Sequence, residues 1–97
     1  MSTYVLLMKL TDQGIRDIKG APQRIDAAIK AWESMGGTMQ GFYMTMGAYD
    51  YVAVGDAPND VAAAAFLLGL GSQGNVTTTT LKAFSRHEAT EIISTLP

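Results

Sequence analysis

The 97-residue sequence contains no cysteine and a single histidine, His87. The absence of cysteine excludes a disulfide framework, a thiolate metal site and a cysteine nucleophile. With one histidine, a metal site would need carboxylates from distant parts of the chain, and no spacing indicates one. His87 falls in the first turn of a predicted helix, where a cation opposes the helix dipole, so it is not expected to be tuned for catalysis. We therefore expect neither a metal nor another cofactor.

Charged residues are also few. Seven Lys and Arg stand against nine Asp and Glu, which gives a net charge of −2, and the basic residues are scattered. Because nucleic-acid binding needs a concentrated basic surface, that class of protein is disfavoured. No apolar run approaches the roughly 20 residues of a membrane span, and the first residues lack the basic region and cleavage site of a signal peptide. These absences predict a soluble, cytoplasmic protein that binds neither nucleic acid nor membrane.

Hydrophobic residues, by contrast, are plentiful. They make up 47% of the chain, whereas charged residues make up 16%. An isolated domain of this size buries only about 60–65% of the surface that its unfolded chain exposes. We expect a single domain over residues 1–97, and a second subunit to cover the surplus of apolar surface.

The residue pattern predicts the order β-α-β-β-α-β-α. The expected elements are a strand at 3–10, a helix within 21–37, two strands within 38–57, a helix at 58–70, a strand at 75–84 and a helix after the capping box of Ser85 and Glu88. A connector with a short helical turn fills 11–20. This order is typical of a ferredoxin-like α+β fold, a four-stranded antiparallel sheet with an additional C-terminal helix.

The two central strands meet at Gly47-Ala48, which fits a two-residue type II′ turn. The register that follows pairs Met46 with Tyr49, Met44 with Tyr51 and Phe42 with Ala53, and on the other face Tyr43 with Val52 and Gly41 with Val54. Both faces of the sheet are then rich in apolar residues. Since helices cover only one face, we expect another copy of the chain to cover the second, in a homodimer or a higher even oligomer.

The segment GLGSQG, Gly69 to Gly74, has the G-x-G-x-x-G spacing of a dinucleotide-binding turn. That turn works when it follows a strand and opens a helix, because the helix N-terminus then meets the phosphates. Here the order is reversed, with a predicted helix before the glycines and a strand after them. The segment is therefore interpreted as the end of a helix and a tight turn.

Asp50 is the acidic residue among the apolar residues of the hairpin. One interpretation is a carboxylate in a pocket, acting as a general base. The other is a structural carboxylate that fixes the hairpin or a subunit contact. Candidate ligand contacts beside Asp50 are Tyr43, Tyr49 and Trp32.

The stretch MGAYDYVAV resembles the GYD family, whose Gly-x-Tyr-Asp signature is Gly47-Ala48-Tyr49-Asp50 here. Supporting similarity lies in LTDQGIRDIK, APND and GSQGNVTTTTLKAF. The chain departs from the pattern at Thr77, where similar members carry arginine. The resemblance implies the dimeric α/β-barrel superfamily, in which two ferredoxin-like sheets pack face to face, but it implies no particular reaction.

Three hypotheses for function remain open from the sequence. The first is an oligomeric module that binds a small organic molecule between the sheet and the helices. The second is a cofactor-free enzyme, an isomerase or monooxygenase, with Asp50 as the base. The third is a structural assembly protein in which the Gly-x-Tyr-Asp turn makes an interface contact.

Overall fold

The structure is a computed structural model that describes residues 1–97. Its elements are β1 (Ser2–Leu10), α1 (Asp12–Arg16), the 3₁₀ helix η1 (Ile18–Gly20), α2 (Ala21–Ser34), β2 (Thr38–Met44), β3 (Tyr51–Ala57), α3 (Asp60–Ser72), β4 (Val76–Ala83) and α4 (Arg86–Ser94). The strands form one antiparallel sheet in the order β2-β3-β1-β4. The predicted ferredoxin-like α+β order and the additional C-terminal helix are confirmed.

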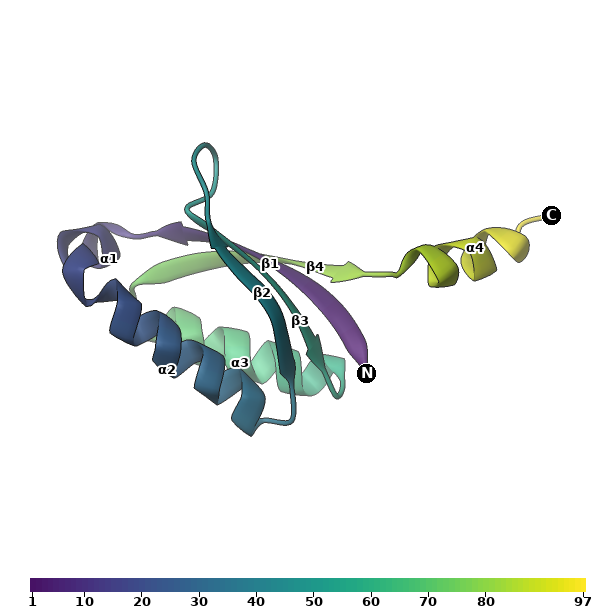
Figure 1. Cartoon of the computed structure of the whole chain (residues 1–97), viewed down its shortest axis with the longest axis horizontal. Coiled ribbons are helices and arrows are strands. Elements are labelled where there is room, and N and C mark those ends of the chain that lie inside the picture. Colours follow the sequence, from purple (N-terminus) through teal and green to yellow (C-terminus); the bar gives the residue numbers. More distant parts are fainter.

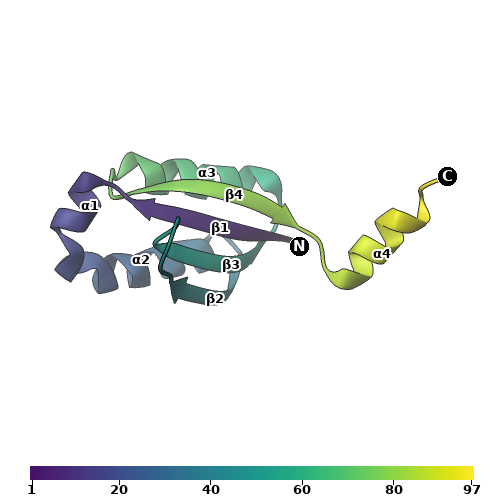
Figure 2. The ribbon, with the colours of Figure 1, turned by 90° about the horizontal axis from the view of Figure 1, so that it is seen from above.

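The molecule has two layers. Helices α2 and α3 lie side by side against one face of the sheet, and no element covers the other face (Figures 1 and 2). Burial follows this arrangement, because alternate residues of β1 and β3 are buried and the residues between them are only half-buried. The core therefore lies between the two long helices and the sheet.

Trp32 of α2 is the centre of this core. Its side chain is fully buried, and its ring packs edge-on against Tyr4 and Phe66 at centroid distances of 6.3 and 5.0 Å. The indole Nε1 donates to the backbone oxygen of Asp56 at 3.0 Å. The indole also needs a glycine beneath it, because a β-carbon on Gly55 would lie 2.9 Å from Nε1. Trp32 is thus a structural residue that joins α2 to the sheet.

The predicted hairpin register is confirmed within the strands, where Met44 lies opposite Tyr51 and Phe42 opposite Ala53. The prediction of a two-residue turn at Gly47-Ala48 is wrong. Strand β2 ends at Met44, and the longer connection of residues 45–50 joins it to β3. At the ends of this connection the Thr45 N–H donates to the Asp50 carbonyl at 2.8 Å, and the Asp50 N–H donates to the Met8 carbonyl of β1 at 2.9 Å. A second irregularity, a bulge at Gln40 between Met39 and Gly41, was not predicted.

The glycine-rich segment lies where a helix ends and a strand follows. Helix α3 continues through Ser72, and Gly74 adopts a φ of +83° before β4 begins. A left-handed conformation of this kind favours glycine. The interpretation of this segment as a helix end and a turn is therefore confirmed.

Helix α3 is fixed over the sheet at its first turn. The Asn59 side chain caps it by accepting from the Ala62 N–H at 2.9 Å. Asp60 accepts a hydrogen bond from the Tyr4 hydroxyl and pairs with Lys82 at 3.2 Å. The Tyr4 hydroxyl, followed by Lys82, lowers the pKa of Asp60, and the same bond to Asp60 raises the pKa of Tyr4.

Helix α4 stands apart from the rest of the chain. It begins with the predicted capping box of Ser85 and Glu88 and then projects beyond the end of β4 (Figure 1). Its apolar side chains Ile92 and Ile93 are exposed, because no other element packs against the helix beyond marginal contact.

Replacing Trp32 by phenylalanine is expected to destabilise the fold. The change removes the indole hydrogen bond and part of a fully buried ring, for a loss of about 2 kcal/mol. Urea denaturation measures it, with Tyr43→Phe as the control, because Tyr43 is 61% exposed. Equal stability of Trp32→Phe and the unaltered chain would contradict the central role given to the indole.

Candidate functional site

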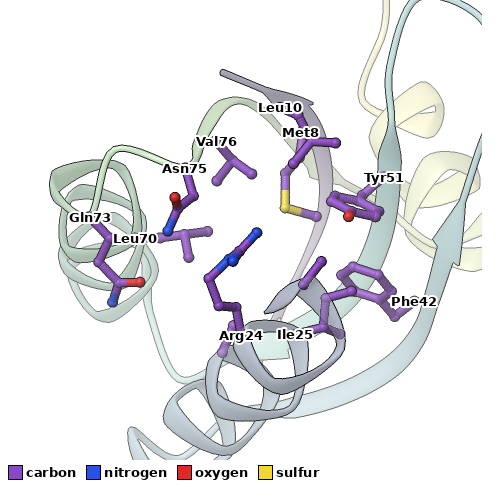
Figure 3. A pocket seen from close by; sticks show the side chains of 12 residues that line it. Met8, Leu10, Arg24, Ile25, Phe42, Tyr51, Leu70, Gln73, Asn75 and Val76 are labelled. Carbon is purple, nitrogen blue, oxygen red and sulfur yellow. The ribbon is translucent and has the colours of Figure 1, made fainter. Parts of the chain in front are cut away.

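A small cavity lies between α2, α3 and the sheet. It has a volume of about 50 Å³, and 9 of its 12 lining residues are hydrophobic. The sheet contributes Met8 and Tyr51, which lie opposite each other on β1 and β3. The helices contribute Ile25 from α2 and Leu70 from α3 (Figure 3). The cavity is therefore apolar inside, with room for one end of an organic molecule.

A larger groove between α2 and α3 adjoins this cavity. Its volume is about 280 Å³. Ala27 and Ala31 of α2 and Gly69 of α3 line it, and such small residues leave the space between the helices unfilled. The residues that line both the groove and the cavity are Arg24, Ala28, Leu70 and Gln73. The two spaces therefore adjoin along these residues, and we treat them together as one candidate site.

Three polar side chains meet this apolar site, and we call Arg24, Gln73 and Asn75 the Arg24 cluster. In Figure 3 the Arg24 guanidinium reaches from α2 toward the middle of the cavity, and Asn75 points into it from the far side. Arg24 Nη1 pairs with the Asp17 carboxylate at 2.8 Å, and Nη2 donates to the Gly14 carbonyl at 3.4 Å. The guanidinium Nε has no hydrogen-bond partner, so the cluster keeps unused donors.

The uncovered side of the sheet is a second candidate surface. We define the open face as the residues Val5, Leu7, Tyr43, Val52, Val54 and Leu81. Val5, Leu7, Val52 and Val54 alternate with buried residues along β1 and β3. Tyr43 and Leu81 pair with them from the edge strands and are 61% and 49% exposed. Apolar side chains thus form a continuous surface across all four strands.

A polar network closes one end of the open face. The Asp56 carboxylate of β3 accepts from Thr3 Oγ1 of β1 at 2.5 Å and from Gln40 Nε2 of β2 at 2.6 Å. These hydrogen bonds, the one from Thr3 foremost, hold the pKa of Asp56 below its usual value. The unpaired residue of the bulge, Gln40, is the one whose side chain reaches Asp56.

At the opposite end, residues 45–50 form a hairpin tip that rises above the sheet (Figure 1). Asp50 holds its base, because Asp50 Oδ2 accepts from the Leu10 N–H at 2.8 Å. The Asp50 carboxylate thus accepts a hydrogen bond from the backbone of β1 at the residue just before β3 begins. The neighbouring Tyr49 ring lies 5.9 Å from the Lys9 ammonium, a cation–π distance.

The four residues predicted as ligand contacts lie in three different environments. Trp32 is in the core beneath the sheet, and Tyr43 is exposed on the open face. Tyr49 and Asp50 are neighbours in the hairpin tip. None of the four lines the cavity or the groove.

Sequence reasoning missed the Arg24 cluster. Arg24 lies four residues before Ala28 and eight before Trp32, so helical spacing places its side chain on the covered side of α2. The sequence signal that could have indicated the cluster was a charged residue on the covered side of α2. For Gln73 and Asn75 the sequence signal was weaker. They flank Gly74 at the end of the glycine-rich segment, which was considered only as a possible dinucleotide-binding turn.

The fold and the two surfaces define a small ferredoxin-like α+β domain with an apolar site under its sheet and an uncovered apolar face above it. The chain belongs to the GYD domain family, whose model matches residues 4–93. A relative from Thermus thermophilus is 34% identical over 84 residues, which cover 86% of this chain and 88% of the relative. That protein is named glutamine synthetase and cystathionine beta-lyase binding protein. No solved structure matches the chain significantly.

No group of three or more His, Asp and Glu side chains lies close enough together to hold a metal ion. None of the helices combines the length and the apolar character that crossing a membrane requires.

Removing the Asp50 carboxylate is expected to loosen the base of the hairpin tip. Asp50→Ala leaves the Leu10 N–H without its acceptor, which costs about 1–2 kcal/mol of unfolding free energy. Asp50→Asn keeps an oxygen acceptor and should lose less than half of that. Urea denaturation tests both, with Asp26→Ala on the exposed side of α2 as the control. A neutral Asp50→Ala would show that the hairpin does not depend on this bond.

The Asp56 network predicts a dependence of stability on pH. Because its folded-state pKa is lowered, Asp56 contributes stability above its unfolded pKa of about 3.9 and loses it as the pH falls through the folded value. Asp56→Asn should therefore be less stable than the unaltered chain at pH 7, and the difference should shrink at pH 3. Urea denaturation at both pH values measures it. A difference that stays constant with pH would contradict the assignment.

Proposed function

We propose that the chain is a protein-binding module. The observation that supports this most is the distribution of exposed apolar residues. Most of the large ones lie on the open face, the hairpin tip and its base, and the α4 arm (residues 84–96). These residues are Tyr43, Met44, Met46, Leu81, Phe84, Ile92, Ile93 and Leu96. Apolar surface concentrated in this way is typical of protein interaction sites.

The relative supports the same class of function, since its name describes a protein that binds two enzymes. Glutamine synthetase and cystathionine beta-lyase are therefore the first partners to test with this chain. A module of this kind needs no catalytic group of its own.

The hairpin tip and the α4 arm are suited to contact a partner enzyme because they stand clear of the sheet. Met44 and Met46 are 79% and 96% exposed. Methionine side chains adapt to differently shaped surfaces, which favours binding to more than one protein. The nine-residue helix α4 is too short to be stable alone in water, so docking on a partner would supply its missing contacts.

The open face itself is proposed to bind a second copy of the chain. Two identical faces related by a two-fold axis would each cover the apolar residues of the other. The result is a homodimer, or a higher even oligomer built from such dimers. This arrangement would leave the tips and arms at the edges of the assembly, where an enzyme can reach them.

A second candidate function is binding of a small organic ligand between the sheet and the helices. The cavity and the adjoining groove favour it, because the site is apolar and carries a few convergent polar groups. Contacts from Trp32, Tyr43, Tyr49 and Asp50 remain predictions, as does Asp50 acting as the base of an isomerase or monooxygenase. One Asp50 oxygen already accepts the Leu10 N–H.

The two protein contacts can be separated by substitution. Leu81→Gln places an amide on the open face, on the edge strand β4 opposite Val5, and should weaken self-association roughly tenfold, as native mass spectrometry over a dilution series would show. Met46→Gln should leave the dimer intact and weaken binding to purified glutamine synthetase or cystathionine beta-lyase, measured by biolayer interferometry. Leu68→Gln is the matched control, because Leu68 is 76% exposed on α3, away from the open face.

Each result bears on a different part of the proposal. A monomer at all concentrations would contradict self-association through the open face. Absence of binding to both enzymes would contradict the partner assignment. Equal effects of Leu81→Gln and Leu68→Gln on self-association would show that the open face is not the contact.

A further inference from the structure

We propose that the Arg24 cluster makes the cavity and groove a binding site for a small carboxylic acid with an apolar tail. The carboxylate is held by Arg24, and the tail lies between α2, α3 and the sheet. This inference rests on the second candidate function, ligand binding under the sheet, and it specifies the chemical class of the ligand. It does not depend on protein binding by the open face or the hairpin tip.

Arg24 has unused hydrogen-bonding capacity. A guanidinium has five N–H donors arranged as a rigid fork. Asp17 occupies Nη1, and the Gly14 carbonyl takes Nη2 at the long distance of 3.4 Å. Nε has no partner, and the Gly14 carbonyl uses only one of the two N–H groups of Nη2. The edge formed by Nε and Nη2 can therefore offer one N–H from each nitrogen to a carboxylate, in the bidentate geometry that arginine prefers.

The polar groups beside Arg24 also have unused hydrogen-bonding capacity. Asn75 Oδ1 accepts from Gln13 Nε2 at 3.0 Å, which leaves the Asn75 amide N–H₂ without a partner. The side-chain amide of Gln73 also makes no hydrogen bond. Both residues line the cavity with Arg24. Arg24 and Asn75 therefore present donors and one positive charge, and the amide of Gln73 can donate or accept, so the cluster favours an anion over a cation.

The space beyond the Arg24 cluster is small and mostly apolar. The groove of about 280 Å³ is slightly smaller than pockets for drug-sized ligands, which start at about 300 Å³. The inner cavity of about 50 Å³ admits the end of a chain between Met8, Ile25 and Val76. A ligand that fits is a short carboxylic acid whose apolar tail enters the cavity.

Asp17 competes with such a ligand. Its side chain is 74% exposed, whereas that of Arg24 is 25% exposed. An ion pair with one partner so exposed is weak, so it does not prevent a ligand from binding Arg24. Its negative charge nevertheless opposes a second carboxylate at the same guanidinium. Removing the charge of Asp17 is therefore expected to strengthen ligand binding, whereas removing the charge of Arg24 is expected to weaken it.

The test is a titration of the full chain with hexanoate and with hexanamide, its neutral analogue. NMR signals of the Ile25 and Leu70 methyl groups report on the cavity, and Ile93 on α4 serves as a reference outside it. Hexanoate should shift the cavity signals in a saturable way, and hexanamide should bind at least roughly tenfold more weakly. Arg24→Gln should weaken hexanoate binding roughly tenfold or more. Asp17→Asn should strengthen it roughly two- to fivefold.

Arg86→Gln removes the same charge from the distant helix α4 and should leave hexanoate binding unchanged. Arg24→Lys keeps the charge without the fork and should give an intermediate affinity, which provides a second comparison if Arg24→Gln fails to fold. Equal binding of hexanoate and hexanamide would overturn the carboxylate assignment but leave a ligand site. If neither compound shifts the cavity signals in a saturable way, both the carboxylate assignment and the ligand site are overturned. Binding to the enzymes, measured on the same variants, reports separately on the proposed protein-binding function.

Discussion

The structure depends on one constraint: the chain has two long helices, and both pack on the same face of its sheet. Trp32 makes this packing possible, because its buried indole fills the space between α2 and the sheet and hydrogen-bonds to the backbone of β3. The close approach requires Gly55 below the ring. With both helices used on one side, the apolar residues of the other face have no cover within the chain. The proposal of a partner for this face rests on this arrangement and not on any single residue.

The same helices leave a site beneath the sheet because of the residues that face each other across them. Where aromatic residues meet, as Trp32 and Phe66 do, the space is filled. One turn or two toward the start of α2, alanines face glycine and leucine of α3, and the side chains no longer meet. The cavity therefore results from a change in side-chain size along a pair of helices. Arg24 lies toward the start of α2, where the neighbouring side chains are small, so its long polar side chain can turn toward the cavity.

Much of the fold could be predicted from the sequence because local patterns determine it. The order of the elements, the pairing of Met44 with Tyr51 and the capping box of Ser85 with Glu88 all follow from residues near one another in the chain. The way the base of the hairpin tip is held could not be predicted, since Asp50 accepts a hydrogen bond from Leu10 of β1, 40 residues away. The Arg24 cluster was missed for a similar reason, because it joins α2 to the turn before β4. Contacts between segments that are distant in the chain leave little trace in a single sequence.

The two proposed surfaces lie on opposite sides of one sheet, and the strands serve both. Side chains alternate along β1, so Met8 lines the cavity while Leu7 belongs to the open face. On β3 the same holds for Tyr51 and Val52. A substitution on one side thus leaves the side chains of the other in place, because only the backbone is shared. This separation would let a module of fewer than 100 residues bind a protein on one face and a small acid on the other without one site blocking the other.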